Sequence, residues 1–94
     1  MPRYLVVRTF EIDQEAMPEV GRRSLEIARE EFPEITWEHS HVIMDGGIVR
    51  QFCIYGAPDP ETLRRHSKRV GAHRIDDLWE IAGDVTPADS PSAP

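Results

Sequence analysis

The chain of 94 residues has no asparagine, a single cysteine and no long apolar run. Because Cys53 has no second cysteine to pair with, no intramolecular disulfide can form, which is typical of proteins in reducing compartments. A membrane-spanning helix needs about 20 consecutive apolar residues, and a signal peptide needs an apolar stretch near the N-terminus. The sequence shows neither pattern, so we expect a cytoplasmic protein with no membrane partner.

Positive charge is scarce as well. The chain carries 11 Lys and Arg residues against 17 Asp and Glu residues, which gives a net charge of −6. The phosphate groups of nucleic acids repel a chain of this sign, so we expect no nucleic-acid partner. The patterns of phosphate-binding loops, CxxC pairs, GxSxG elbows, HExxH zinc sites and calcium loops are also absent. We therefore expect no nucleotide or flavin cofactor.

The length allows a single domain. The stretch that begins at Thr86 consists mainly of Pro, Ser, Ala and Asp. These residues bury too little apolar surface to offset the entropy lost on ordering. We assign residues 1–86 to one domain and predict that residues 87–94 form a disordered tail.

Local patterns predict four strands and two helices. Asp13 and Asp59 are suitable N-caps, Gly71 is a suitable helix stop, and the two glycines after Asp45 indicate a tight hairpin turn. The predicted elements are a strand over 4–10, a helix over 14–32, strands over 35–43 and 48–55, a helix from 60 to 70 and a strand over 78–85.

This order of elements, β-α-β-β-α-β, is that of the ferredoxin-like α+β sandwich, in which two helices cover one face of an antiparallel sheet. The second face of such a sheet has no helix to cover it. Several predicted strands carry apolar side chains on both faces, Trp79 among them. A second copy of the chain could cover that face, so we expect a homodimer of the dimeric α/β-barrel type.

The segment His39-Ser40-His41 is the strongest candidate for a metal site. Alternate residues of a strand point to the same face, so the two imidazoles can reach one ion. A two-residue turn would place His39 opposite Ile54, His41 opposite Phe52, and Cys53 on the other face. The alternative is a pair of exposed strand histidines that make ordinary hydrogen bonds.

Cys53 and His66 are the weaker candidate ligands. Cys53 lies in the middle of a strand, where a cysteine commonly acts as a small apolar residue, and it would be reactive only beside a cationic group. His66 shares a helix face with Leu63 and Val70, so it is either a core histidine or the cationic neighbour of Cys53. His73 follows the helix end and is expected at the surface.

The second predicted helix is basic and the first is acidic. The cations could bind an anionic ligand or an acidic partner, or they could simply complement the neighbouring helix. The basic residues are Arg64, Arg65, Lys68, Arg69 and Arg74, and the acidic residues are Glu15, Glu19, Glu26, Glu30, Glu31 and Glu34.

Three segments resemble a family of small bacterial ferredoxin-like proteins, catalogued mainly as a domain of unknown function, that includes a nickel-binding member. The segments are Pro2 to Phe10, Trp37 to Val42, and Phe52 to Asp59 with the helical Leu63-Arg64-Arg65-His66. The resemblance covers about residues 2–86. It implies a homodimer, metal near the dimer surface, and a role in nickel sequestration or detoxification. His41 stands where we expect an aromatic residue in the family, which adds a possible ligand.

Metal binding, with nickel or a similar late first-row divalent ion, is therefore the function that we expect, with His39 and His41 as ligands and His66 and Cys53 as further contributors.

The alternative is a small-ligand-binding protein or enzyme, such as a cofactor-free monooxygenase, cyclase or isomerase. His66 would then act as general base and Tyr55 as acid or hydrogen-bond donor, with Cys53 nearby. A cavity that reaches His66 would favour this alternative. The missing asparagine counts against an Asn-Trp-His monooxygenase. An interaction module that binds through the basic helix is the third possibility, and an enzyme is the less expected outcome.

Overall fold

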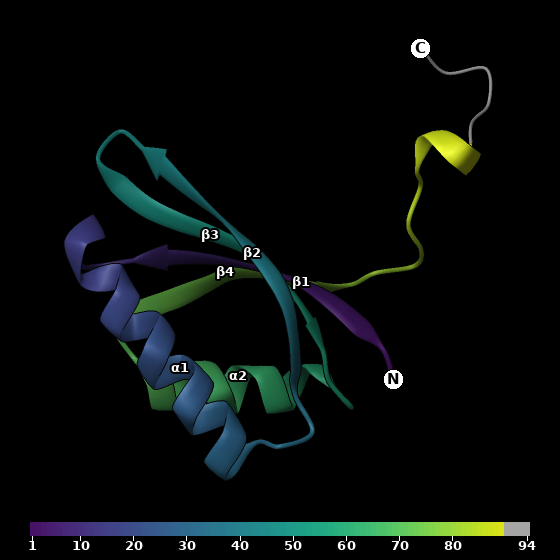
Figure 1. Ribbon diagram of the computed structural model, residues 1–94, viewed down its shortest axis with the longest axis horizontal. Helices are drawn as coiled ribbons and strands as arrows, with labels where there is room; N and C mark the ends of the chain where they lie inside the picture. Colours follow the sequence, from purple (N-terminus) through teal and green to yellow (C-terminus); the bar gives the residue numbers. More distant parts are fainter. Residues whose placement is uncertain (90–94) are drawn as a thin grey trace.

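The computed structural model describes residues 1–89 and consists of a four-stranded sheet and two α-helices (Figure 1). In chain order the elements are β1 (Arg3–Phe10), η1 (Gln14–Ala16), α1 (Met17–Glu31), β2 (Thr36–Asp45), β3 (Ile48–Gly56), α2 (Pro60–Val70), β4 (His73–Glu80) and η2 (Pro87–Asp89).

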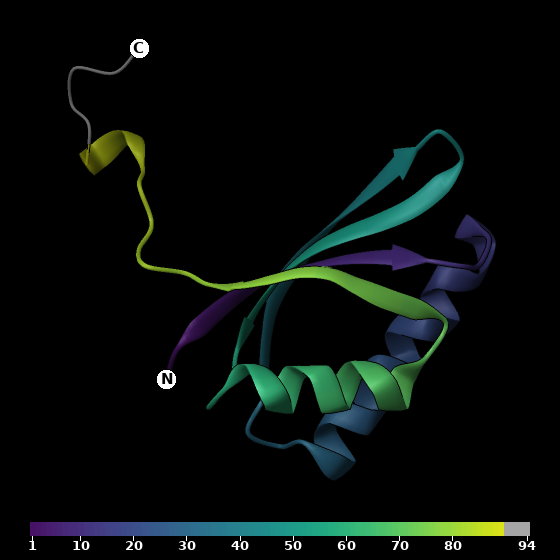
Figure 2. The same cartoon turned by 180° about the vertical axis from the view of Figure 1, so that it is seen from behind.

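The strands are antiparallel and lie in the order β2-β3-β1-β4. Both helices lie on the same side of the sheet (Figures 1 and 2). We call this side the covered face. The other side, which we call the open face, carries no helix among residues 1–89. The ferredoxin-like α+β fold predicted from the sequence is confirmed. None of the described helices is both long enough and apolar enough to cross a membrane.

The hairpin between β2 and β3 has the register expected from its turn. Asp45 pairs with Ile48, so Gly46 and Gly47 form a two-residue turn with φ values of 59° and 87°. Positive φ at both positions is the requirement of a type I′ hairpin turn, and glycine meets it without strain. The register then places His39 opposite Ile54 and His41 opposite Phe52, on the open face.

Two β-bulges, which the sequence pattern did not reveal, change the face that nearby residues occupy. One lies between Trp37 and His39, and the other interrupts the pairing of β1 with β4 next to Arg8. An extra residue in one strand reverses the alternation of side chains beyond it. Because of the first bulge, Trp37 pairs with Tyr55 on the covered face, while His39 pairs with Ile54 on the open face.

The predicted ends of α2 are confirmed. The Asp59 carboxylate accepts hydrogen bonds from the backbone N–H and the hydroxyl of Thr62, at 2.7 and 2.8 Å, and Gly71 ends the helix with a φ of 73°. The predicted side-chain cap at Asp13 is wrong. Its backbone carbonyl, not its carboxylate, accepts from Ala16, because the turn η1 separates Asp13 from α1.

The last strand begins earlier than predicted and also ends earlier. The prediction was residues 78–85, whereas β4 runs over His73–Glu80. Its limits follow from its partner, because β4 pairs with every residue of β1 from Phe10 to Tyr4, which leaves out only Arg3. Beyond Glu80 the chain leads away from the sheet to η2 (Figures 1 and 2). Residues 90–94 of the predicted tail lie outside the described residues.

The apolar core lies between the sheet and the helices. Its main cluster joins β1, β3 and α2 through Tyr4, Val6, Cys53, Tyr55, Ala57 and Leu63. A second cluster, formed by Ile27, Phe32 and Val70, joins α1 to α2. The open face has an apolar area of its own, in which Trp79 of β4 pairs with Leu5 of β1 and is 53% exposed.

Candidate functional site

Two groups of polar side chains could carry chemistry, one on each face of the sheet. On the open face, His39 and His41 lie side by side on the edge strand β2, with ring centroids 5.3 Å apart and an angle of 82° between the rings. Both residues are exposed. Neither ring makes a hydrogen bond to any other residue in the described part of the chain, so both imidazoles are free to bind an ion.

The spacing of these two rings fits a shared metal ion. A metal–nitrogen bond of about 2.1 Å puts each ring centre about 3.2 Å from the ion, so two ligands at a tetrahedral angle have centroids about 5 Å apart. The observed separation of 5.3 Å is close to this value. Imidazole is a suitable ligand for nickel, copper and zinc.

Residues 1–89 do not supply a complete ligand set. No group of three or more His, Cys, Asp or Glu side chains within this part of the chain is placed to hold a metal ion. Glu38, next to His39 in sequence, is already engaged. Its carboxylate accepts two hydrogen bonds from Arg3, at 2.7 and 3.0 Å, and this contact holds its pKa below the usual range. Further ligands would therefore have to come from outside these residues or from solvent.

The other two predicted ligands, Cys53 and His66, lie on the covered side. Cys53 is fully buried and pairs with Ser40 of β2. Ser40 lies between His39 and His41 in the sequence, so its side chain and that of Cys53 point to the face opposite the two histidines. Burial raises the pKa of its thiol, so the thiol stays protonated near neutral pH. His66 is 1% exposed. The sheet separates both residues from the His39–His41 pair, so the four do not form one site within a chain.

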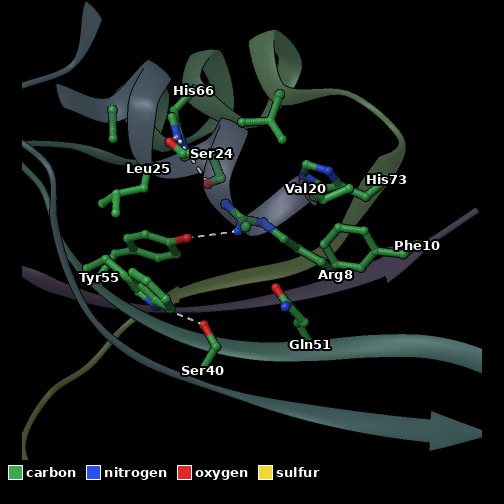
Figure 3. Close-up of a pocket in the computed structure, with 14 residues that line it drawn as sticks. Arg8, Phe10, Val20, Ser24, Leu25, Ser40, Gln51, Tyr55, His66 and His73 are labelled. Atoms are coloured by element: carbon green, nitrogen blue, oxygen red, sulfur yellow. Dashed lines mark hydrogen bonds between the residues drawn. The ribbon is translucent and has the colours of Figure 1, made fainter. Parts of the chain in front are cut away.

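On the covered side there is a cavity of about 70 Å³ between α1 and the sheet. It reaches His66, and exposed residues Gly21 of α1 and Trp37 of β2 line it, so it opens between these two elements. Figure 3 shows the polar side chains that point into this region. The lining residues are Arg8, Phe10, Val20, Gly21, Ser24, Leu25, Ala28, Trp37, Ser40, Gln51, Tyr55, His66, Val70 and His73.

The most unusual lining residue is Arg8, which the sequence analysis did not single out. It is 3% exposed, and its Nη1 donates a hydrogen bond to the Tyr55 hydroxyl at 3.0 Å (Figure 3). A signal for it was present in the sequence, because Arg8 has the same parity along β1 as the core residues Tyr4, Val6 and Phe10. An arginine at such a position is placed in the interior.

Two histidines line the same cavity. Nε2 of His66 lies 3.0 Å from the carbonyl oxygen of Ser24, and Nδ1 has no hydrogen-bond partner within residues 1–89. His73, expected at the surface, is half-buried instead, because the extended β4 places it opposite Phe10, where its ring stacks on the phenylalanine. Burial, helped by the charge of Arg8, lowers the pKa of His66 and lowers that of His73 to about 4.

The basic stretch of α2 takes part in contacts between the helices. Arg69 forms a bidentate ion pair with Glu31 of α1, with nitrogen–oxygen distances of 2.9 and 2.6 Å. Arg23 of α1 donates hydrogen bonds to the carbonyl oxygens of Arg69 and Val70. The charge complementarity weighed in the sequence analysis is therefore present at this position.

Comparisons with known proteins agree with this architecture. The crystal structure of SCO4226 from Streptomyces coelicolor A3(2) superposes with a TM-score of 0.70 at 18% identity, covering 88% of this chain and 99% of that one. The de novo designed protein Foldit4 superposes with a TM-score of 0.58 at 15% identity, covering 89% and 100%. At these sequence identities the two structural matches support the fold alone. No curated protein sequence matches the chain.

The family comparison covers nearly all of the described residues. Residues 4–89 match the family described as nickel responsive protein SCO4226-like. This range includes all four histidines and the cysteine. It also includes every strand residue of the sheet apart from Arg3, which is the first residue of β1. The chain therefore belongs to the SCO4226-like family of nickel-responsive proteins.

Proposed function

We propose that this chain is a metal-binding protein that takes nickel or a similar late first-row divalent ion, through His39 and His41, for sequestration or homeostasis. The observation that carries the proposal is the pair of adjacent, exposed imidazoles 5.3 Å apart, which have no competing hydrogen bonds within residues 1–89. The family description supports nickel as the first ion to test. The metal ion is bound cargo in this proposal, and no reaction is assigned to it.

A homodimer would complete this site. Two imidazoles do not saturate a divalent ion, which takes four or more ligands in protein sites. The open face beside them is apolar and no helix of residues 1–89 covers it, and a second copy packed on it would bring a second set of side chains near the histidine pair. We propose this assembly, in a cytoplasmic setting that keeps the buried Cys53 reduced.

Isothermal titration calorimetry with nickel chloride, on protein purified without a histidine tag, tests the metal site. We expect saturable binding by the wild-type chain and the loss of at least about 90% of the binding heat in the double variant His39→Ala, His41→Ala. Val42→Ala is the matched control, since it changes the same strand at a side chain that points to the other face.

Equal nickel binding by the double variant would contradict the proposal. Binding by the double variant that instead depends on His66 or Cys53 would move the site to the covered side. Acidification should weaken binding in the wild-type chain, because imidazole ligates metal only in its neutral form.

A second candidate function is favoured by one observation, the cavity that reaches His66. A filled core would have counted against a small-ligand-binding protein or enzyme of the dimeric α/β-barrel type. The nitrogen Nδ1 of His66 could accept a proton. The Tyr55 hydroxyl, which accepts from Arg8, keeps its own proton free to donate to a ligand.

A further inference from the structure

The cavity on the covered side combines one buried cation with the absence of an anion. Among its lining residues, all of them within the described part of the chain, there is no Asp or Glu. Arg8, by contrast, is 3% exposed and forms no ion pair with any described residue. An unpaired buried charge is costly, and proteins ordinarily pair it or keep it for a ligand.

The unpartnered atoms of Arg8 form the edge of the guanidinium that recognises carboxylates. Nη1 contacts the Tyr55 hydroxyl at 3.0 Å and the Cys53 sulfur at 3.9 Å. Nε and Nη2 are buried and have no hydrogen-bond partner among residues 1–89. These two nitrogens point the same way and present two parallel N–H donors, which match the two oxygens of a carboxylate.

Other arginines of this chain use the same edge for that purpose, Arg3 and Arg69 among them. Nε and Nη2 of Arg3 hold the two carboxylate oxygens of Glu38, and Nε and Nη2 of Arg69 hold those of Glu31. In both pairs the partner is a carboxylate supplied by the chain itself. At Arg8 the described chain supplies none, although this arginine is far more buried than the other two.

The two histidines of the cavity do not alter its charge near neutral pH. His66 and His73 are both neutral there, because burial and the nearby Arg8 oppose their protonation. Arg8 is therefore the one charged side chain among the lining residues. A ligand that brings a single negative charge would neutralise the cavity.

The walls and the size of the cavity restrict the rest of the ligand. Much of the lining is apolar, with Phe10, Val20, Leu25, Ala28 and Val70 around the polar groups. A volume of about 70 Å³ is smaller than the roughly 150 Å³ of an apolar cavity that admits benzene. The space therefore suits a short carbon chain and not an aromatic ring or a nucleotide.

We propose that this cavity binds a small organic monocarboxylate, whose carboxylate pairs with the guanidinium of Arg8 and whose short carbon chain contacts the apolar wall. Polar groups that line the cavity together with Arg8, such as Gln51 and the Tyr55 hydroxyl, would orient any further polar atom of the ligand (Figure 3). This inference rests on the second candidate function and is independent of metal binding at His39 and His41.

Nuclear magnetic resonance titration of the ¹⁵N-labelled chain, without added metal, tests the inference. The probe is sodium propionate, and the references are propionamide, inorganic phosphate and sodium chloride at equal ionic strength. We expect a saturable shift of the Arg8 Nε–Hε resonance with propionate. Propionamide and phosphate should each bind at least about tenfold more weakly, because one lacks the charge and the other lacks the carbon chain.

The variant Arg8→Met keeps the length of the side chain and removes its charge. It should reduce the affinity for propionate by at least about tenfold and leave that for propionamide within about twofold. Arg64→Met, at an exposed position of α2 outside the lining, is the matched control and should bind propionate as the wild type does. If Arg8→Met does not fold, the titrations of the wild-type chain still decide the question.

The possible failures are distinguishable. Equal affinity for propionate and propionamide, with no effect of Arg8→Met, would overturn the carboxylate inference and leave a small-ligand cavity in place. Phosphate binding as tight as that of propionate would overturn the organic part of the inference. The absence of any saturable shift up to about 100 mM of every probe would remove both the inference and the second candidate function.

Discussion

Histidines lie on both sides of the sheet, but they differ in exposure and in hydrogen bonding. On the open face, His39 and His41 are exposed and have no hydrogen-bond partners among residues 1–89. On the covered face, His66 and His73 are held by hydrogen bonds and kept neutral by burial. The difference shows that environment, not residue type, decides which imidazoles are available to an ion from solution and which belong to an internal site.

Arginine shows the same contrast. Arg3 and Arg69 are satisfied by carboxylates of the chain at its surface, whereas Arg8 is buried and pairs with no carboxylate of residues 1–89. An exposed ion pair adds little to stability because water competes for it. A lone buried cation is costly, so the burial of Arg8 without an ion pair among residues 1–89 calls for a reason beyond stability.

The largest expected effect is on the free energy of unfolding, to which the covered side should contribute more than the open face. Leu63→Ala, at a fully buried position of the covered side, should lower the free energy of unfolding by about 2–5 kcal/mol. Ile43→Ala, at a 43% exposed position of β2, should cost less than about 1 kcal/mol. Urea denaturation monitored by circular dichroism measures both values, and similar losses in the two variants would contradict the division of the faces.

The next prediction concerns the proposed dimer. Trp79→Lys puts a charge in the middle of the apolar area on the open face, so sedimentation velocity should show a dimer for the wild type and a monomer for the variant. Val42→Lys is the control, because Val42 is exposed to a similar degree, 50% against 53%, but points to the other side. A wild-type chain that sediments as a monomer at about 100 μM would contradict the proposed assembly.

The smallest expected effect is a dependence on pH that comes from the covered face. In the folded chain the pKa of His66 is lowered and that of His73 is about 4, against 6.5 in the unfolded state. Between about pH 6.5 and 4 the unfolded chain therefore binds more protons than the folded chain, so the free energy of unfolding should fall as the pH falls through this window.

The histidine contribution can be isolated by substitution. His73→Phe removes one titrating group and retains a ring that can stack on Phe10. Its stability, measured in urea at pH 7, 6 and 5, should fall less steeply than that of the wild-type chain. Equal slopes for the two proteins would mean that His73 does not contribute.

Much of the fold could be predicted because it depends on short-range rules. The glycine pair requires a tight turn, and the turn fixes the pairing of His39 with Ile54 and of His41 with Phe52. Asp59 and Pro60 mark the start of α2, and Gly71 marks its end. Each of these features depends on residues that are close to one another in the chain.

The sequence by itself therefore determined the order of the elements, the register of the hairpin and the presence of two histidines on one face. Only the tertiary structure decided where β4 begins, where the two bulges lie, and that Arg8 is enclosed without a carboxylate from residues 1–89. The physical reason is that a strand ends where its partner ends, and a buried charge is recognised only when every neighbour around it is known. Those neighbours come from distant parts of the chain, and local patterns do not bring them together.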